Sequence, residues 1–548
     1  MSGLLSHLMI VPIVLPLVTA AVLVLLGEQR RRLKSLLGMA ATAAGLVVAA
    51  MILWRVDSGD RVGVYLASNW EAPFGIVLVA DRLSAIMLVL TGVVSLCAAL
   101  YADAGWARVG VHFHALFQIQ LMGLNGAFLT GDLFNLFVFF EVMLAASYGL
   151  QLHGSGLPRV RTGLHYIAVN LLASSLFLIG LAVLYGVLGT LSMADIAQKL
   201  ALVPAPDRGL LYAGATILAI AFLIKAAIWP LNFWLVPAYG AASAPVAGLF
   251  AVMTKVGIYA LLRLWTLLFS GDAGPSARFG HSFFLYGGLV TIGVATLGLL
   301  STVRLDRIAG FAIIVSSGTL LAAIGMGSLS MTAAALFYLV SATLGVSALF
   351  LLVELIDRVG ATRQQQMQDV VVPGEDTNLD DAQVPLVGRV FPVSIALLGL
   401  AFMACALLVA GLPPLSGFVA KFSLLSAIVS SDDVHAAGAV VSSAGWLLLA
   451  LLLLSGFAAT VSLARAGIRS LWATGHRSAP ELKAAEAIAV LALLVSSVVL
   501  TVFAEPVTRY MRATAAELHA PRAYIETVMS TKARPRATPP EPAPETSP

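Results

Sequence analysis

Long apolar stretches alternate with short polar ones along most of this chain. An α-helix rises about 1.5 Å per residue, so a run of about 20 apolar residues crosses the roughly 30 Å hydrocarbon core of a bilayer. Backbone polar groups in lipid must be satisfied within the segment, which favours helices. We therefore predict an all-α polytopic membrane protein with about fourteen transmembrane helices. The predicted spans are 4–26, 33–54, 78–101, 112–130, 132–152, 162–188, 210–231, 244–269, 282–302, 308–326, 331–356, 392–412 with a continuation to 430, 443–464 and 486–505.

Composition supports a membrane location. The chain has 548 residues, of which 59% are hydrophobic and 11% are charged, whereas soluble domains carry roughly 25% charged residues. The first apolar run begins at Leu4 without a preceding basic residue or a small-residue cleavage site. We therefore expect a first spanning helix and not a removable signal peptide.

The placement of basic residues predicts the orientation. Lys and Arg gather in alternate loops, beginning with Arg30, Arg31, Arg32 and Lys34 after the first span. The positive-inside rule makes that loop cytoplasmic, which puts the N-terminus outside, and an even number of spans returns the C-terminus to the same side. The polar segment 357–391 is predicted to be a cytoplasmic loop, and 515–529 a short amphipathic surface helix. The tail 531–548, rich in Pro, Ala, Thr and Glu, is predicted to be disordered.

A few charged residues lie inside the apolar runs. Each costs about 2.5–3.5 kcal/mol at the centre of a spanning helix, so each needs a partner, water or a function. Arg263 and Glu354 lie near predicted helix ends, where long side chains can reach water. Glu141 lies deep in its apolar run with no water-facing end in reach, and Lys225, Lys255 and Lys421 also lie inside apolar runs.

Two of these lysines accompany helix-breaking prolines. Pro230 follows Lys225 by five residues, and Lys421 follows Pro413 and Pro414. Proline removes a helical hydrogen bond, and broken helices at corresponding positions of two halves are typical of ion transporters. Buried charges in such a setting are typical of a proton relay, although a static ion pair between Glu141 and Lys225 would also account for that pair.

The sequence shows no motif for metal binding, disulfide formation or a cofactor. Cys97 and Cys405 lie in separate apolar runs, and the nearest histidine pair, His112 and His114, points to different sides of a helix. The sequence holds no haem, iron–sulfur or nucleotide motif. We expect no cofactor, no metal site and no nucleic-acid partner, and protons and ions as the transported species.

Three blocks carry a resemblance to a known family: TGDLFNLFVFFEVMLAASYGL (130–150), WPLNFWLVPAYGAASAPVAGLFAVMTKVGIYALLR (229–263) and GLPPLSGFVAKFSLL (411–425). They resemble the antiporter-like proton-channel family shared by respiratory complex I and the multisubunit Mrp-type cation/proton antiporters. Complex I members usually carry histidines where this chain has Asn232 and Tyr239. Tyr239 and the Gly131–Asn135 stretch are similar to the D-type subunit of Mrp antiporters, called Pha in some proteobacteria.

The resemblance implies functional positions and an architecture. The family's proton-transport residues fall on Glu141, Lys225, Lys255 and Lys421, with Glu354, Tyr239, Ser316 and Ser341 as possible accessory residues. The implied fold has two inverted five-helix repeats, each with a broken helix. The implied units are 1–111 (three N-terminal helices), 112–269 (first repeat), 281–465 (second repeat), 486–530 (last helix and surface helix) and 531–548 (tail). Where many relatives have a titratable residue in the second repeat, this chain has hydroxyls, so water must bridge the relay there.

Three functional hypotheses follow. The first is a proton-translocating subunit of a Na⁺(K⁺)/H⁺ antiporter, in a bacterial inner membrane, driven by the proton-motive force. It would be a transporter and not an enzyme, assembled with A-, B-, C-, E-, F- and G-type Mrp subunits. The second is a proton-pumping subunit of a complex I-like NADH:quinone oxidoreductase or a membrane-bound hydrogenase. Asn232 and Tyr239 argue against this hypothesis, because they stand where complex I members usually carry histidines. The third is a scaffold whose buried charges serve only helix pairing.

Overall fold

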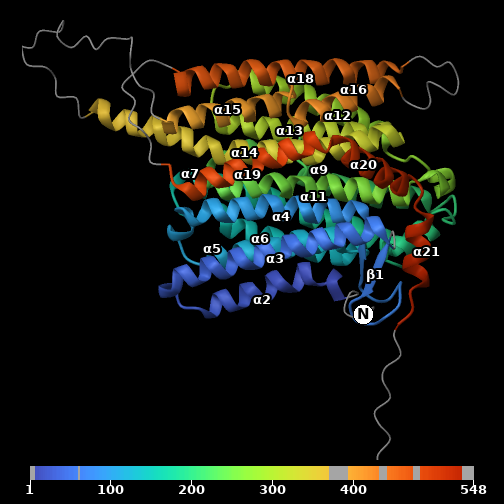
Figure 1. Ribbon diagram of the computed structural model, residues 1–548. Helices are drawn as coiled ribbons and strands as arrows, with labels where there is room; N and C mark the ends of the chain where they lie inside the picture. Colours follow the sequence, from blue (N-terminus) through green and yellow to red (C-terminus); the bar gives the residue numbers. More distant parts are fainter. Residues whose placement is uncertain (1–6, 60–61, 369–392, 431–440, 473–481, 534–548) are drawn as a thin grey trace, which may run out of the picture.

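The helices of the computed structural model lie side by side and run roughly parallel across the bundle (Figure 1). The structure describes residues 7–59, 62–368, 393–430, 441–472 and 482–533. In this described part, twelve helices are long and apolar enough to cross a membrane, and α2 (Val11–Leu25) is a shorter apolar helix. Each predicted span overlaps a helix or a pair of helices separated by a break, which confirms the polytopic helical fold.

The N-terminal part contains a small β-hairpin that the sequence did not lead us to predict. Helices α2 and α3 (Arg31–Ser58) are followed by β1 (Gly63–Leu66) and β2 (Val77–Ala80), which pair antiparallel with Gly63 opposite Ala80. The predicted span 78–101 therefore starts too early. Helix α4 (Arg82–Asp103) begins only after Asp81, whose Oδ1 accepts a hydrogen bond from the Ser84 N–H at 2.9 Å and caps the helix.

The first predicted repeat consists of four continuous helices and one broken helix. A tight turn at Thr130–Asp132 separates its first two helices, whose predicted spans end at 130 and begin at 132, and Asp132 caps the second by accepting a hydrogen bond from the Asn135 N–H at 2.8 Å. A short helix, α8 (Met193–Leu200), was not predicted. The crossing elements are α5 (Phe113–Leu129), α6 (Leu133–Gln151), α7 (Leu157–Leu188), the broken pair α9 (Arg208–Lys225) and α10 (Leu235–Ala241), and α11 (Ala244–Leu268).

The second predicted repeat has the same order of elements. These are α12 (His281–Ser301), α13 (Leu305–Met326), α14 (Leu329–Gln368), the broken pair α15 (Val393–Ala410) and α16 (Ser416–Val429), and α18 (Ser443–Gly467). Because five crossings are an odd number, α12 starts at the opposite end of the bundle from α5. This order is the one expected for inverted repeats, while the boundaries of the predicted units stay a prediction.

Helix α11 forms the centre of the bundle. Its most apolar stretch is buried on all sides, and α13 and α14, which pack against it, are almost as enclosed. A helix that is apolar around its whole circumference belongs in such a position. Lys255 of α11 is therefore enclosed by protein, and Arg263, closer to the end of the helix, is also buried.

The C-terminal part differs from the prediction in its boundaries. Helix α14 continues to Gln368, so the segment 357–391 begins as helix, and its residues 369–391 lie outside the described residues. After α19 (Ala484–Val502), the predicted surface helix 515–529 is two helices, α20 (Ala504–His519) and α21 (Arg522–Ser530), interrupted at Pro521. Most of the tail, 534–548, lies outside the described residues.

Candidate functional site

Glu141 and Lys225 share one hydroxyl group. The Ser174 hydroxyl of α7 donates a hydrogen bond to the Glu141 carboxylate of α6, and Lys225 Nζ donates to Ser174 Oγ at 3.4 Å. Lys225 is buried, whereas Glu141 is half-buried. The Lys225 ammonium also lies 5.1 Å from the centre of the Phe140 ring, a cation–π distance. The predicted pair therefore lies together, joined by a serine that the sequence did not single out.

Lys225 is the last residue of α9, and the chain leaves the helix directly after it. The break begins before Pro230, earlier than the proline alone predicts. Side chains bond to two backbone groups at the break. The Trp234 indole donates to the Ile224 carbonyl at 3.2 Å, and the Trp229 N–H donates to Thr291 Oγ1 of α12 at 3.1 Å. The carboxyl end of a helix carries partial negative charge, so it favours a cation at Lys225.

Lys255 lies in the middle of the bundle. Its Nζ donates a hydrogen bond to Ser316 Oγ of α13 at 2.7 Å. Helices α9 and α11 approach closely beside it, since a Cβ added to Gly257 would lie 2.9 Å from the Ala226 nitrogen. Tyr239 is also buried against α11, but its hydroxyl donates to the Phe250 carbonyl at 3.1 Å.

Lys421 lies on α16, directly after the break that contains Pro413 and Pro414. Its Nζ donates a hydrogen bond to the carbonyl of Ala410, the last residue of α15, at 2.7 Å. Nearby, Ser341 and Ser416 are 2.8 Å apart at their hydroxyl oxygens, and Ser416 and Ser497 are also 2.8 Å apart. Both broken segments thus hold a lysine at the carboxyl end of their first half.

A small cavity lies between the central and distal lysines. It has a volume of about 30 Å³, and its lining includes Ser316, Tyr338, Ser341, Ser455 and Lys421. A cavity needs roughly 10–15 Å³ on this measure to hold one water molecule, and a polar lining retains it. The hydroxyls that replace titratable groups in this repeat therefore face a space with room for the bridging water that the predicted relay requires.

Glu354 has its described contacts away from the four relay residues. Its carboxylate accepts a hydrogen bond from the Trp106 indole at 2.7 Å and forms an ion pair with Arg358. Arg358 also bonds to Glu486 at 2.7 Å, and Glu486 is buried. These contacts favour a structural ion pair with Arg358 over the accessory role that the family resemblance implied for Glu354.

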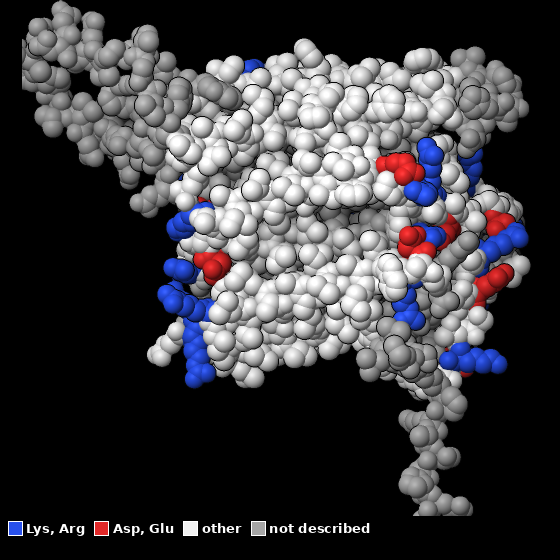
Figure 2. Space-filling view, viewed as in Figure 1, with Lys and Arg blue, Asp and Glu red and all other residues white. Residues whose placement is uncertain are grey.

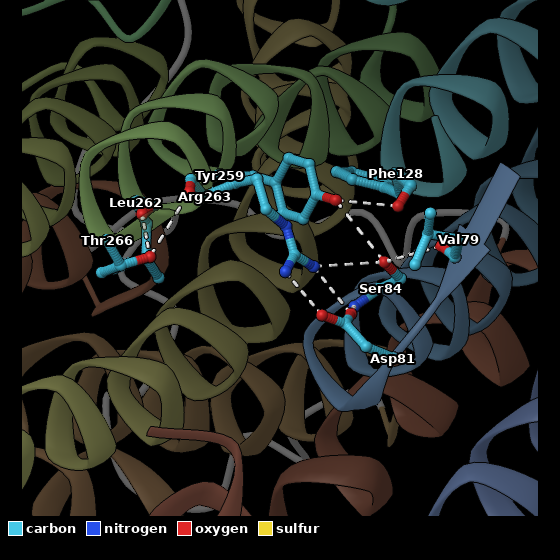
Figure 3. A network of polar contacts seen from close by, with 8 residues as sticks. All are labelled: Val79, Asp81, Ser84, Phe128, Tyr259, Leu262, Arg263 and Thr266. Atoms are coloured by element: carbon cyan, nitrogen blue, oxygen red, sulfur yellow. Dashed lines mark hydrogen bonds and ion pairs between the residues drawn. The ribbon is translucent and has the colours of Figure 1, made fainter. Parts of the chain in front are cut away.

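Arg263 is held by an ion pair with Asp81, which the interpretation of a side chain that reaches a helix end did not include, and both residues line a cavity of about 480 Å³. Arg263 is buried and donates to both carboxylate oxygens of Asp81, at 2.5 and 2.7 Å, and to Ser84 Oγ at 3.4 Å (Figure 3). Tyr259, one turn earlier on α11, lies 3.5 Å from the Ser84 hydroxyl and donates to the Phe128 carbonyl at 2.8 Å. This network ties α11 to the start of α4 and the end of α5.

Among the described residues, no group of three or more His, Cys, Asp or Glu side chains is arranged to hold a metal ion. Ser174 and Asp81 are polar partners that were not predicted from the sequence. Asp81 had a usable signal, because an aspartate three residues before a serine at the start of an apolar run is typical of a helix N-cap.

Comparison with known proteins decides the family. Residues 130–446 match the family model described as NADH:quinone oxidoreductase/Mrp antiporter, transmembrane. The chain belongs to this family. The matched region includes the four residues of the predicted relay and both broken helices.

Two curated family members are similar over nearly their whole length. The chain is 50% identical to the D-type subunit of a probable K⁺/H⁺ antiporter of Rhizobium meliloti, covering 97% of this chain and 99% of the relative. It is 32% identical to the D-type subunit of a Na⁺/H⁺ antiporter of Alkalihalophilus pseudofirmus, covering 96% and 99%. These matches confirm the predicted resemblance to the D-type antiporter proteins.

Solved structures agree on the fold. A chain in the structure of the Mrp complex from a Dietzia species superposes with a TM-score of 0.78 at 28% identity, covering 96% of this chain and 99% of that chain. A chain of respiratory complex I from Thermus thermophilus superposes with a TM-score of 0.73 at 20% identity, covering 96% and 100%, and shares the fold.

Proposed function

We propose that this chain is the proton-translocating subunit of a multisubunit monovalent cation/proton antiporter driven by the proton-motive force. Protons move along the line from Glu141 through Lys225 and Lys255 to Lys421, coupled to opposite movement of K⁺ or Na⁺. The chain acts as a transporter component and catalyses no redox reaction.

One observation carries the proposal. Polar groups follow one another through an otherwise apolar bundle, from Glu141 and Ser174 to Lys225, and from Lys255 and Ser316 through a water-sized cavity to Lys421. Helices α9 and α11 are in close contact between the two segments. Isolated charges are costly in a membrane, so a row of them with hydroxyl bridges is typical of a proton path. The relatives named as components of K⁺/H⁺ and Na⁺/H⁺ antiporters support the same function.

The proposal includes partners and an orientation. Glu141 and Lys421 are only partly buried, and a charge facing lipid is costly. We infer that other Mrp-type subunits cover both ends of the row, in a complex with A-, B-, C-, E-, F- and G-type subunits. The basic loop at Arg30–Arg32 faces the cytoplasm in a bacterial inner membrane, with both termini outside.

The test is cation-induced collapse of ΔpH in everted membrane vesicles. The complete gene set is expressed in an antiporter-deficient host, and wild type is compared with Glu141→Gln. Glu505→Gln serves as the matched control, because Glu505 is an exposed carboxylate on α20 paired with Arg509 at 3.0 Å. Assembly of each variant is verified by co-purification of the other subunits.

We expect K⁺ or Na⁺ to collapse ΔpH with wild type and Glu505→Gln, and not with the assembled Glu141→Gln variant. Normal transport by an assembled Glu141→Gln complex would show that the relay is wrong and would favour the scaffold hypothesis. Comparing K⁺ with Na⁺ in the wild type identifies the exchanged cation.

A further inference from the structure

A basic cavity lies at one end of the bundle, apart from the proposed relay. It has a volume of about 260 Å³ and is formed by the start of α3, the end of α4 and the connection from α4 to α5. Its basic and imidazole lining residues are Arg31, Arg32, Lys34, Arg108, His112 and His114.

The charge of this cavity is one-sided. Four of its lining residues are Lys or Arg, and its lining contains one carboxylate, Asp103, which accepts a hydrogen bond from the Ser35 hydroxyl at 2.5 Å. Figure 2 shows the same excess on the surface, where the lower left edge, over the junction of α2 and α3, is blue. Helix α3 begins at Arg31, so the positive end of its helix dipole adds to the positive charge of the cavity. The site is therefore suited to an anion.

Apolar surface adjoins the cavity. Leu33 and Leu36 on α3 are 41% and 61% exposed, and Val109 and Val111, beside Arg108, are 55% and 57% exposed. The cavity lies where the apolar helix α3 begins and the apolar helix α4 ends. This is the depth of lipid headgroups when the two helices cross a bilayer. Cationic groups at that depth, flanked by exposed aliphatic side chains, match a ligand with a phosphate and two acyl chains.

We propose that this cavity binds the headgroup of an anionic phospholipid, with the phosphate held by Arg32 and Arg108 and the acyl chains lying along α3. Guanidinium groups suit this ligand because they form paired hydrogen bonds to phosphate oxygens. Basic pockets between membrane helices are known to select anionic headgroups. The site is independent of the relay and of the direction of antiport.

The test measures lipid binding to the assembled complex, purified in a neutral detergent, by native mass spectrometry. Phosphatidylglycerol is compared with phosphatidylcholine of the same acyl chains, and glycerol 3-phosphate tests whether a soluble anion suffices. The variant is Arg32→Gln/Arg108→Gln, in which both side chains are exposed, so folding should be unaffected. The matched control is Arg161→Gln/Arg307→Gln, two exposed arginines at the start of α7 and α13, at the same end of the bundle.

We expect wild type and the control to bind phosphatidylglycerol at this site in preference to phosphatidylcholine. The double variant should bind it about thirtyfold more weakly, because each basic residue near an anionic lipid contributes about a fivefold factor. Equal binding of the two lipids by wild type, unchanged binding by the double variant, or equally strong binding of glycerol 3-phosphate would overturn the proposal.

Discussion

Lys421 donates a hydrogen bond at 2.7 Å to the carbonyl of Ala410, across the break between α15 and α16. The Lys421 ammonium thus occupies the negative end of the half-helix α15. Such a site attracts a proton without a fixed carboxylate beside it. A proton carrier that is held mainly by a helix end can release its proton more readily than one locked in an ion pair.

A substitution at Gly456 can test the hydrogen bond between Lys421 and Ala410 without changing a charge. A Cβ at this position would lie 3.1 Å from both Lys421 Nζ and the Ala410 carbonyl oxygen. We predict that Gly456→Ala lowers the initial rate of ΔpH collapse about tenfold, because the added methyl group displaces a hydrogen bond of a charged group. Gly399→Ala on α15 is the control, since nothing lies within 4 Å of its Cβ. Equal rates for the two assembled variants would show that the Lys421–Ala410 contact is not part of transport.

The bridge between Glu141 and Lys225 depends on a single hydroxyl. We predict that Ser174→Ala slows antiport by at least about tenfold, because both charged groups lose a shared hydrogen-bond partner. Ser175→Ala is the matched control, since the Ser175 hydroxyl is exposed and donates to the Leu171 carbonyl at 3.1 Å. The rates are compared in everted vesicles at equal amounts of assembled complex. A Ser174→Ala complex as fast as the control would mean that the two charges exchange protons without the serine.

These two serines also show where prediction from sequence ends. Charged residues in apolar runs are costly, so Glu141 and the lysines stand out from the sequence alone. A serine in a membrane helix usually bonds to the backbone of its own helix, as Ser175 does. Which of two adjacent serines faces α6 and α9 depends on the rotation of α7, and the sequence does not specify that rotation.

Helix ends set a second limit on prediction. Both broken helices could be predicted from their prolines, because a proline has no backbone N–H to donate to the helical hydrogen bonds. The position of the first break was less predictable, since α9 already ends at Lys225, five residues before Pro230. Asp81 was assigned to the interior of a span because β2 is as apolar as the helix that follows it. Its pairing with Arg263 joins residues far apart in the chain, so only the fold reveals it.

The cavity between Ser316 and Lys421 predicts a water-dependent step. Ala342 lines it, and a valine there adds two methyl groups to a space of about 30 Å³. We predict that Ala342→Val strongly reduces antiport while the complex still assembles, because the added volume displaces the bridging water at a packing cost of about 1–3 kcal/mol. Ala342→Ser, which keeps the space and adds a hydroxyl, should transport close to the wild-type rate. Undiminished transport by the valine variant would exclude water in this cavity from the path.

The buried pair Asp81–Arg263 should be structural and strongly coupled. Removing one partner leaves an uncompensated buried charge, at a cost of about 3–5 kcal/mol, whereas removing both costs less. We predict that Asp81→Asn and Arg263→Met each lower the thermal stability of the purified complex more than the double variant does. The comparison is a double-mutant cycle, measured by unfolding in detergent. Additive losses in the double variant would show that the two side chains do not stabilise the protein as a pair.

His153 provides a pH-dependent contribution to stability at the turn between α6 and α7. A ring nitrogen lies 2.9 Å from the Trp106 carbonyl oxygen, and burial, assisted by the nearby Arg159 guanidinium, lowers the pKa of His153 below its usual 6.5. The folded protein therefore favours the neutral ring, so this contribution is present above about pH 6.5 and is lost as the pH falls through the lowered pKa. We predict that His153→Gln reduces the loss of thermal stability between about pH 7.5 and pH 5.5, whereas the exposed His165→Gln leaves it unchanged. An identical pH profile for wild type and His153→Gln would show that His153 does not titrate on unfolding in this range.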